Sequence, residues 1–210
     1  MSGEGHKDWV SSMKFHPKGL HIVTGSGDAT VKVWDFVNTT CTFTFKDHIQ
    51  PVWSIDLNET GDYVATGSMD HSCRLLDINV GKCRNTFRGH VDSVNSVHWM
   101  PFSNTLATAS ADKTVSVWDV RSGLCTQTFY GHENSVNACK FSVKGDKLAS
   151  CDSNGIVKSW DIRKCTEINT YQHDKQLSAN CLSIDRTGNI IGVGYDNGLI
   201  YLFNDITGER

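Results

Sequence analysis

Residues 89–119 read GHVDSVNSVHWMPFSNTLATASADKTVSVWD, opening with Gly89-His90 and closing with Trp118-Asp119. The pattern recurs along the chain with a period of 42 residues, because the opening histidines are His6, His48, His90 and His132. Each histidine is followed 28 residues later by a large apolar residue and then by aspartate: Trp34-Asp35, Leu76-Asp77, Trp118-Asp119 and Trp160-Asp161. A fifth, more divergent copy runs from about Tyr171 to Asn204. Such regularity indicates a repeat architecture.

One repeat contains four short stretches with strand character. In the third repeat they run over residues 94–99, 106–110, 114–119 and 124–129, and apolar residues alternate with small or polar ones in the third stretch. Turn residues separate them, including Ser103-Asn104 and Ala111-Asp112-Lys113. Four short antiparallel strands per repeat make one blade of a β-propeller.

A period of 40–45 residues with a Gly-His opening and a Trp-Asp close is typical of a WD40 propeller blade. The sequence therefore predicts an all-β fold in one domain, residues 1–210, with four full blades and a three-stranded fifth. The expected blades span residues 6–45, 48–87, 90–129, 132–171 and 173–210. Since a WD40 ring usually has seven blades, we expect an arc of such a ring. Its two apolar end faces would be covered by flanking sequence or by a chain that completes the ring.

Composition excludes several classes of function. The net charge is −3 and no Lys/Arg cluster is present, so neither nucleic acid nor a membrane surface is an expected partner. The N-terminal residues lack the basic and apolar regions of a signal peptide. No phosphate-binding loop, nucleophile elbow or Cys-x-x-Cys pair occurs. The chain is therefore not expected to be an enzyme, and we predict no cofactor, no catalytic residue and no metal site.

The eight cysteines do not form a disulfide pattern. Cys41, Cys83 and Cys125 are 42 residues apart and occupy equivalent strand positions, which cannot all be paired. We expect reduced thiols, as in a cytosolic protein.

Each well-kept repeat also holds a His, a Ser and an Asp that could be mistaken for a catalytic triad. The similarity to WD40 blades implies instead a buried, hydrogen-bonded tetrad that includes the Trp indole, because buried polar groups need partners. The expected members are His6, Ser26, Asp28, Trp34, His90, Ser110, Asp112, Trp118, His132 and Trp160. The hydroxyl could come instead from Thr24, Thr66 and Thr108. Repeat two has Leu76 in place of Trp, and repeat four has Asn154 where Asp is expected.

Rim positions just before the first strand of each blade are the candidate partner-binding residues. They are Asp8, Trp9, Gln50, Pro51, Asp92, Ser93, Asn134 and Ser135. Trp9 is the foremost among them, because an aromatic side chain on a loop can anchor a partner. Packing of Trp9 against a neighbouring blade is the competing interpretation.

Several stretches go beyond what a blade requires, including Pro101-Phe-Ser-Asn-Thr-Leu106, Gln127-Thr-Phe-Tyr-Gly-His132 and Ser150-Cys-Asp-Ser153. Across essentially all 210 residues the chain resembles the sperm-associated antigen sixteen family, WD-repeat proteins of the central apparatus in motile cilia and flagella. The resemblance implies a scaffold in the cytoplasm and cytoskeleton, on the axoneme, with other central-apparatus proteins as partners. A cytosolic peptide-binding adaptor, such as a substrate receptor or signalling hub, is the alternative.

Overall fold

The computed structural model describes residues 5–19, 21–172 and 177–209 of the 210-residue chain. These residues form β-strands joined by short turns and loops, with no helix among them. The strands are β1 (Val10–Phe15), β2 (His21–Ser26), β3 (Val31–Asp35), β4 (Thr40–Phe45), β5 (Val52–Leu57), β6 (Tyr63–Ser68), β7 (Ser72–Asp77), β8 (Lys82–Arg88), β9 (Val94–Trp99), β10 (Thr105–Ser110), β11 (Val115–Asp119), β12 (Cys125–Phe129), β13 (Val136–Phe141), β14 (Lys147–Asp152), β15 (Val157–Asp161), β16 (Thr166–Tyr171), β17 (Ala179–Ile184), β18 (Ile190–Tyr195) and β19 (Ile200–Asn204).

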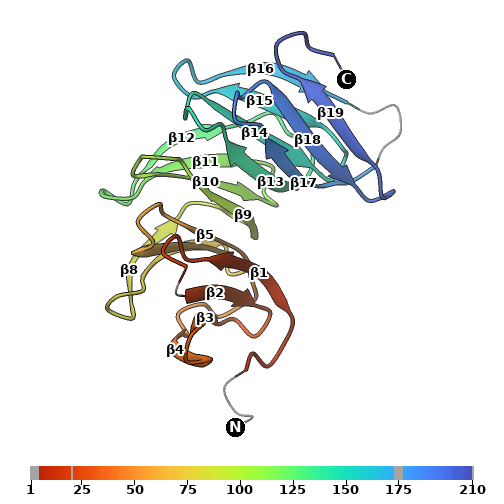
Figure 1. The fold of residues 1–210 in the computed structure, drawn as a ribbon. Coiled ribbons are helices and arrows are strands. Elements are labelled where there is room, and N and C mark those ends of the chain that lie inside the picture. The colour runs from red at the N-terminus through yellow and green to blue at the C-terminus, as the bar shows by residue number, and fades with distance from the viewer. Residues whose placement is uncertain (1–4, 20, 173–176, 210) are drawn as a thin grey trace.

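Each repeat folds into one antiparallel sheet in chain order. Blades one to four are the four-stranded sheets β1–β4, β5–β8, β9–β12 and β13–β16, and blade five is the three-stranded sheet β17–β19. The predicted all-β architecture of four full blades and a three-stranded fifth is therefore confirmed. Figure 1 shows the sheets following one another around an open arc, from β1–β4 to β17–β19.

The first strands of successive blades lie side by side along the inside of the arc, β1 on β5, β5 on β9, β9 on β13 and β13 on β17. Side chains of one inner strand accept hydrogen bonds from the backbone of the next. Ser54 Oγ accepts from Val97 N at 3.2 Å, and Asp56 Oδ2 accepts from Trp99 N at 2.7 Å. These bonds join each of these inner strands to the next.

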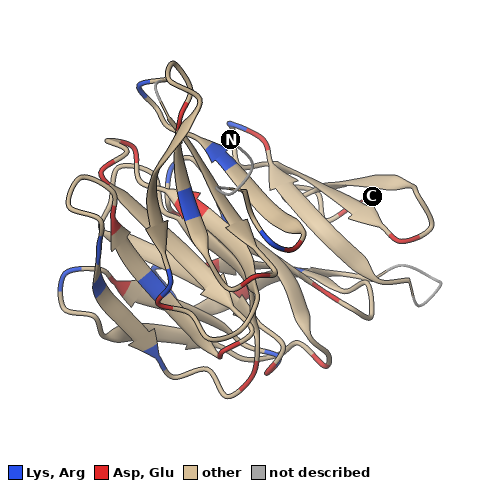
Figure 2. Cartoon of the chain, turned by 90° about the horizontal axis from the view of Figure 1, so that it is seen from below, with Lys and Arg blue, Asp and Glu red and all other residues tan. Residues whose placement is uncertain are grey.

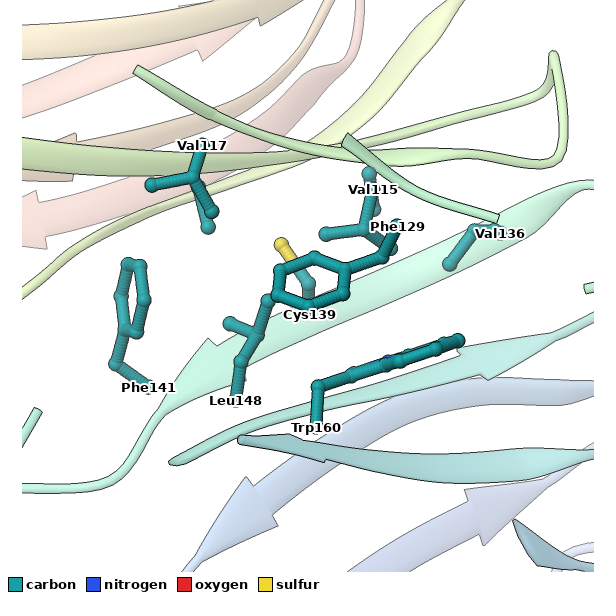
Figure 3. Packing of buried hydrophobic residues seen from close by; sticks show 10 residues of the cluster. Val115, Val117, Phe129, Val136, Cys139, Phe141, Leu148 and Trp160 are labelled. Atoms are coloured by element: carbon teal, nitrogen blue, oxygen red, sulfur yellow. The ribbon is translucent and has the colours of Figure 1, made fainter. Parts of the chain in front are cut away.

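The core lies between blades rather than within them. Alternation along a strand places apolar side chains on one face of each sheet, where they meet the next blade. Figure 3 shows this between blades three and four, where Val115, Val117 and Phe129 face Val136, Cys139 and Trp160. Equivalent clusters fill the other three junctions.

The two ends of the arc expose the residues that form this core elsewhere. Met13 and Phe15 of β1 are 53% and 65% exposed, whereas Ile55, the equivalent of Met13 in blade two, is 1% exposed. At the other end Ile200 of β19 is 75% exposed, whereas its equivalent Val31 is 1% exposed. Blades one and five therefore each present one uncovered apolar face.

The recurrent Asp after each Trp or Leu closes the turn between the third and fourth strands. Asp35 Oδ1 accepts hydrogen bonds from the backbone N–H groups of Val37 and Asn38 at 2.8 and 2.9 Å. In blade five Asn204 Oδ1 does the same for Ile206 at 2.9 Å. The residue recurs because an Asx side chain satisfies the backbone of a tight turn.

The arc has two faces that differ in their loops. One face carries the loops that lead from each fourth strand to the next blade, together with the turns between second and third strands. We call it the His-Asp face, because His6 and Asp28 of blade one lie in such a loop and such a turn. The opposite face carries the turns between first and second and between third and fourth strands. Figure 2 shows Lys and Arg segments interspersed with Asp and Glu segments along the ribbon.

All eight cysteines are free thiols, and Cys73, Cys139 and Cys151 are buried. Burial raises the pKa of the Cys139 thiol to about 12. Within the described ranges no helix has the length and hydropathy needed to cross a membrane, and no group of three or more His, Cys, Asp or Glu is placed to hold a metal ion.

Candidate interaction surfaces

In blade one a chain of hydrogen bonds joins a loop histidine to the third strand. His6 Nδ1 lies 3.0 Å from Asp28 Oδ2, and His6 Nε2 lies 2.7 Å from Thr24 Oγ1. The Trp34 indole N–H donates to the same Thr24 oxygen at 2.8 Å. Blade three repeats the arrangement with His90, Asp112, Thr108 and Trp118 at 2.8, 2.7 and 2.8 Å.

Of the two hydroxyls that the sequence left open, Thr24 and Thr108 are the ones used, so the expected members Ser26 and Ser110 are not part of the tetrads. Register is the reason: Trp34 pairs with Ile22, so its indole reaches the diagonal residue Thr24, and Ser26 lies two residues further along β2. Ser26 Oγ instead accepts from the backbone N–H of Asp28 at 3.1 Å and closes the turn. Ser110 acts in the same way toward Asp112.

Blade four keeps the tetrad with a different carboxylate. The sequence interpretation looked to position 154 for the Asp, but His132 Nδ1 lies 2.9 Å from Asp152 Oδ2. Ser150 Oγ lies 2.7 Å from His132 Nε2 and accepts from the Trp160 indole at 2.8 Å. Asp152 occupies the β14 position that is Ser26, Ser68 and Ser110 in other blades. The sequence signal that could have identified Asp152 is an Asp at a position that is Ser in blades one to three, two residues before Asn154.

Blades two and five lack an indole that donates to such a hydroxyl. In blade two His48 lies 2.7 Å from both Asp70 Oδ2 and Thr66 Oγ1, and Leu76 takes the Trp position. In blade five Val193 occupies the hydroxyl position, and Tyr195 OH donates to the carbonyl oxygen of Gly155 in blade four.

These groups are structural. The His and Asp side chains of the four pairs are at most 9% exposed, and each pair is joined by a hydrogen bond. Their recurrence in blade after blade agrees with a role in holding loops to sheets.

The buried carboxylates predict a loss of stability in acid. For Asp70, desolvation by burial raises the pKa, but the hydrogen bonds from His48 and Ser72 outweigh it and hold the pKa well below its usual range. A depressed folded-state pKa means that the unfolded chain binds the proton first. The stabilisation is therefore complete above about pH 5 and is lost as the pH falls from about 4 toward the lowered folded value.

Thermal unfolding followed from neutral pH down to about pH 3 should show this decline, and Asp70→Asn should flatten it. Glu59→Gln, at an exposed turn position in the same blade, is the matched control and should leave the slope unchanged. Parallel curves for Asp70→Asn and the unmodified chain would contradict the assignment.

The predicted rim residues all lie on the His-Asp face. In each of blades one to four the same backbone hydrogen bond holds one rim residue: its carbonyl oxygen accepts from an N–H group in the turn between the second and third strands. The pairs are Trp9 with Gly27, Pro51 with Met69, Ser93 with Ala111 and Ser135 with Ser153. Asp8, Trp9, Gln50 and Asp92 are exposed, whereas Pro51, Ser93, Asn134 and Ser135 are half-buried. Asn134 and Ser135 are engaged, since Asn134 donates to Asn154 and Ser135 accepts from Asn95.

Trp9 is joined by an aromatic residue that the sequence interpretation missed. The rings of Trp9 and Trp53 stack with centroids 6.1 Å apart and an interplanar angle of 29°. They remain 51% and 38% exposed. Gly27 makes room for this, because a Cβ there would stand 2.6 Å from the Trp9 ring. We call Trp9 and Trp53 the aromatic ledge. The sequence signal for Trp53 was its position, since the equivalent residues in repeats one, three and four are the smaller Ser11, Asn95 and Asn137.

Comparison with known proteins gives three relatives among many. Residues of this chain are 39% identical over 57 positions to nuclear distribution protein nudF 2 of Penicillium rubens, covering 27% of this chain and 12% of that protein. They are 35% identical over 51 positions to an F-box protein of Saccharomyces cerevisiae, covering 24% and 8%. They are 48% identical over 40 positions to protein Notchless of Drosophila melanogaster, covering 19% and 8%. The matched segments are thus a small part of each relative.

A solved structure, that of U3-55K, superposes with a TM-score of 0.88 at 19% sequence identity, covering 98% of this chain and 64% of that chain. At this identity the likeness shows the fold alone. The family model described as WD domain, G-beta repeat matches residues 1–35, 39–77, 81–119 and 123–161. Propellers of this type generally serve as non-catalytic scaffolds for protein–protein interaction. Because the match covers well over half of its residues, the chain belongs to the WD-repeat family.

Proposed function

We propose that this chain is a non-catalytic scaffold that holds partner proteins through the aromatic ledge on its His-Asp face. The observation that carries the proposal is the stacked and exposed Trp9–Trp53 pair at the junction of blades one and two. Large aromatic side chains that protrude from a rigid framework are the residues most often responsible for binding energy at interfaces. The ledge sits on such a framework, because the Trp9 carbonyl accepts from Gly27 N at 2.9 Å.

The partners we propose are proteins of the axonemal central apparatus, and the place of action is the motile cilium or flagellum. Support comes from the sequence resemblance described above. Two of its segments contain Phe102 and Tyr130, which are exposed and contribute nothing to the core of the fold. Side chains that the blade does not need are the ones expected to reflect a particular partner.

A cytosolic adaptor is the second candidate, and the match to an F-box protein over 51 residues favours it. The two are separated by extracting cells with detergent. A scaffold stays on the demembranated axoneme and leaves only with high salt, whereas an adaptor appears in the soluble fraction with exchangeable clients. Release of the whole pool by detergent alone would refute the axonemal proposal.

Replacing Trp9 by alanine should weaken partner capture by about tenfold or more with little change in the melting temperature, because Trp9 is 51% exposed. Phe36→Ala is the matched control, since Phe36 is also an exposed aromatic but follows β3 on the opposite face. Quantitative co-precipitation and thermal unfolding measure the two effects. Unfolding of the Trp9 variant would show that the ring is part of the core, and unchanged capture would remove the ledge from the interface.

We also propose that further WD-type blades, of this chain or another, cover the two uncovered end faces. Each blade has a face that packs on the blade after it, which we call the trailing face, and a face that packs on the blade before it. In the first junction Val31 and Val33 of blade one pack in this way on Val52 and Ile55 of blade two. Ile200 and Leu202 offer the same trailing pattern in blade five.

A further inference from the structure

A groove of about 700 Å³ lies between blades two and three on the opposite face of the arc. Its walls are the turns β5–β6, β9–β10 and β11–β12, and its floor contains Leu75 and Trp99. Both floor residues belong to the buried cluster between these blades. A cavity of this size is within the range of sites that hold ligands or peptide side chains.

The residues around this groove differ from their counterparts at the junction of blades one and two. There the Phe43 ring packs over Gly81, so that a Cβ on Gly81 would stand 2.6 Å from the ring, and the cavity measures about 210 Å³. Blade two has the smaller Asn85 at the Phe43 position. It has Arg84 where blade one has Thr42, which adds a positive charge to the wall.

Phe102 stands at the edge of the groove in a strained conformation. Its side chain is 84% exposed and its φ is 55°, in the left-handed region that costs a residue with a side chain about 1–2 kcal/mol. The turn is held in this shape, since the Trp99 indole donates to Ser103 O at 2.7 Å and Met100 N donates to Thr105 O at 2.9 Å. An exposed aromatic ring kept in place at the expense of backbone strain points to a function outside the fold.

The charged residues of the groove favour an anion. Arg84 is held by Asp77, with Nε and Nη2 each 2.9 Å from Asp77 Oδ2, and its side chain remains half exposed. Arg121 of blade three contacts the neutral Asn104 amide through Nε and Nη2 at 3.2 and 3.0 Å, with the amide oriented to accept. Asp77 offsets the charge of Arg84, whereas Arg121 has no ion pair among the described residues, and Glu59 is the one carboxylate among the described lining residues.

We propose that this groove binds an extended peptide segment of a partner protein in which an acidic residue closely follows or precedes an aromatic or large aliphatic one. The apolar side chain would pack between Phe102 and Tyr63 above the Leu75–Trp99 floor. The carboxylate would pair with Arg121 and with the free side of Arg84, since guanidinium and carboxylate groups form paired, charge-assisted hydrogen bonds. The site rests on the proposed scaffold function but uses a different face from the aromatic ledge.

Selection of a random-peptide display library on the full chain tests the site, followed by fluorescence polarisation with the selected peptides. We expect enrichment of peptides with the acidic and apolar pattern. Arg121→Glu and Phe102→Ala should each raise the Kd by at least about tenfold. Arg88→Glu, an exposed charge reversal in blade two that does not line the groove, and Trp9→Ala should leave the Kd unchanged. Circular dichroism confirms that each variant is folded.

Failure to enrich any peptide, enrichment of basic peptides, or insensitivity to Arg121→Glu would overturn the groove assignment. If the selected peptides lose binding in Trp9→Ala alone, the groove is refuted while the ledge remains the interaction surface. If cell fractionation shows that the protein is not retained on the axoneme, the proposed function fails, but the peptide-binding measurements on the groove remain valid.

Discussion

Replacing Asp152 by alanine is expected to lower the free energy of unfolding by about 3–5 kcal/mol. The carboxylate is fully buried, lies 2.9 Å from His132 Nδ1 and accepts from the backbone N–H groups of Asn154 and Ile156 at 3.0 and 2.9 Å. Its removal leaves the histidine and two backbone donors in the interior without an acceptor. Burying an unpaired polar or charged group is among the costliest single changes a protein can suffer.

Chemical denaturation of Asp152→Ala beside Asn154→Ala measures this effect. Asn154 holds the position where the first three repeats have their Asp, but its half-buried side chain accepts from Asn134 and its backbone N–H donates to Asp152. Its replacement should cost about 1 kcal/mol or less. Equal losses for the two variants would show that the carboxylate has no special part in blade four.

Asp205→Ala is expected to cost about 3 kcal/mol and to loosen blade five from blade four. Asp205 is buried at a position that is Ile78, Val120 and Ile162 in blades two to four. It forms an ion pair with Lys147 and accepts from Ser159 at 2.6 Å and from Tyr171 OH and Asn169 at 3.1 Å. Desolvation opposes its charge, but the hydrogen bonds from Lys147 and Ser159 outweigh this and hold the pKa of Asp205 below its usual value.

Because these partners belong to blade four, the loss should appear as faster amide exchange in β17–β19 before the rest of the arc opens. Asp205→Asn keeps an acceptor oxygen for Ser159 and should have a smaller effect. Asp196→Ala, at an exposed turn of the same blade, serves as the control. Uniform acceleration in all five blades would argue against a local docking role for Asp205.

Features that depend on residues close in the chain could be predicted from the sequence. The four strands of a blade follow from alternation, and their turns follow from residues such as Asp35 and Asn104. The prediction that blade two lacks an indole partner is correct, because the sequence itself shows Leu76 at the Trp position. The choice between Ser26 and Thr24 could not be made in this way, since it depends on which residue of β2 lies diagonal to Trp34 on β3.

The candidate surfaces were harder to foresee for the same reason. Trp9 could be singled out as an aromatic on a loop, but its neighbour Trp53 belongs to the next blade, 44 positions away. Phe102 could be noted as unusual, yet the groove beside it is lined by Arg84 from the other side of a blade junction. Packing between blades brings these residues together, and no single repeat contains them.

The sequence by itself determined the blade, its period and its turns, because these rest on alternation, Asx side chains and glycines acting over a few residues. Only the tertiary structure decided that Asp152 replaces the missing Asp of repeat four, that Trp9 stacks on Trp53, and that a groove opens between blades two and three. The physical reason is that a hydrogen bond or a ring contact depends on distances of a few ångströms between strands. Those distances are set by register and by the packing of one blade on the next.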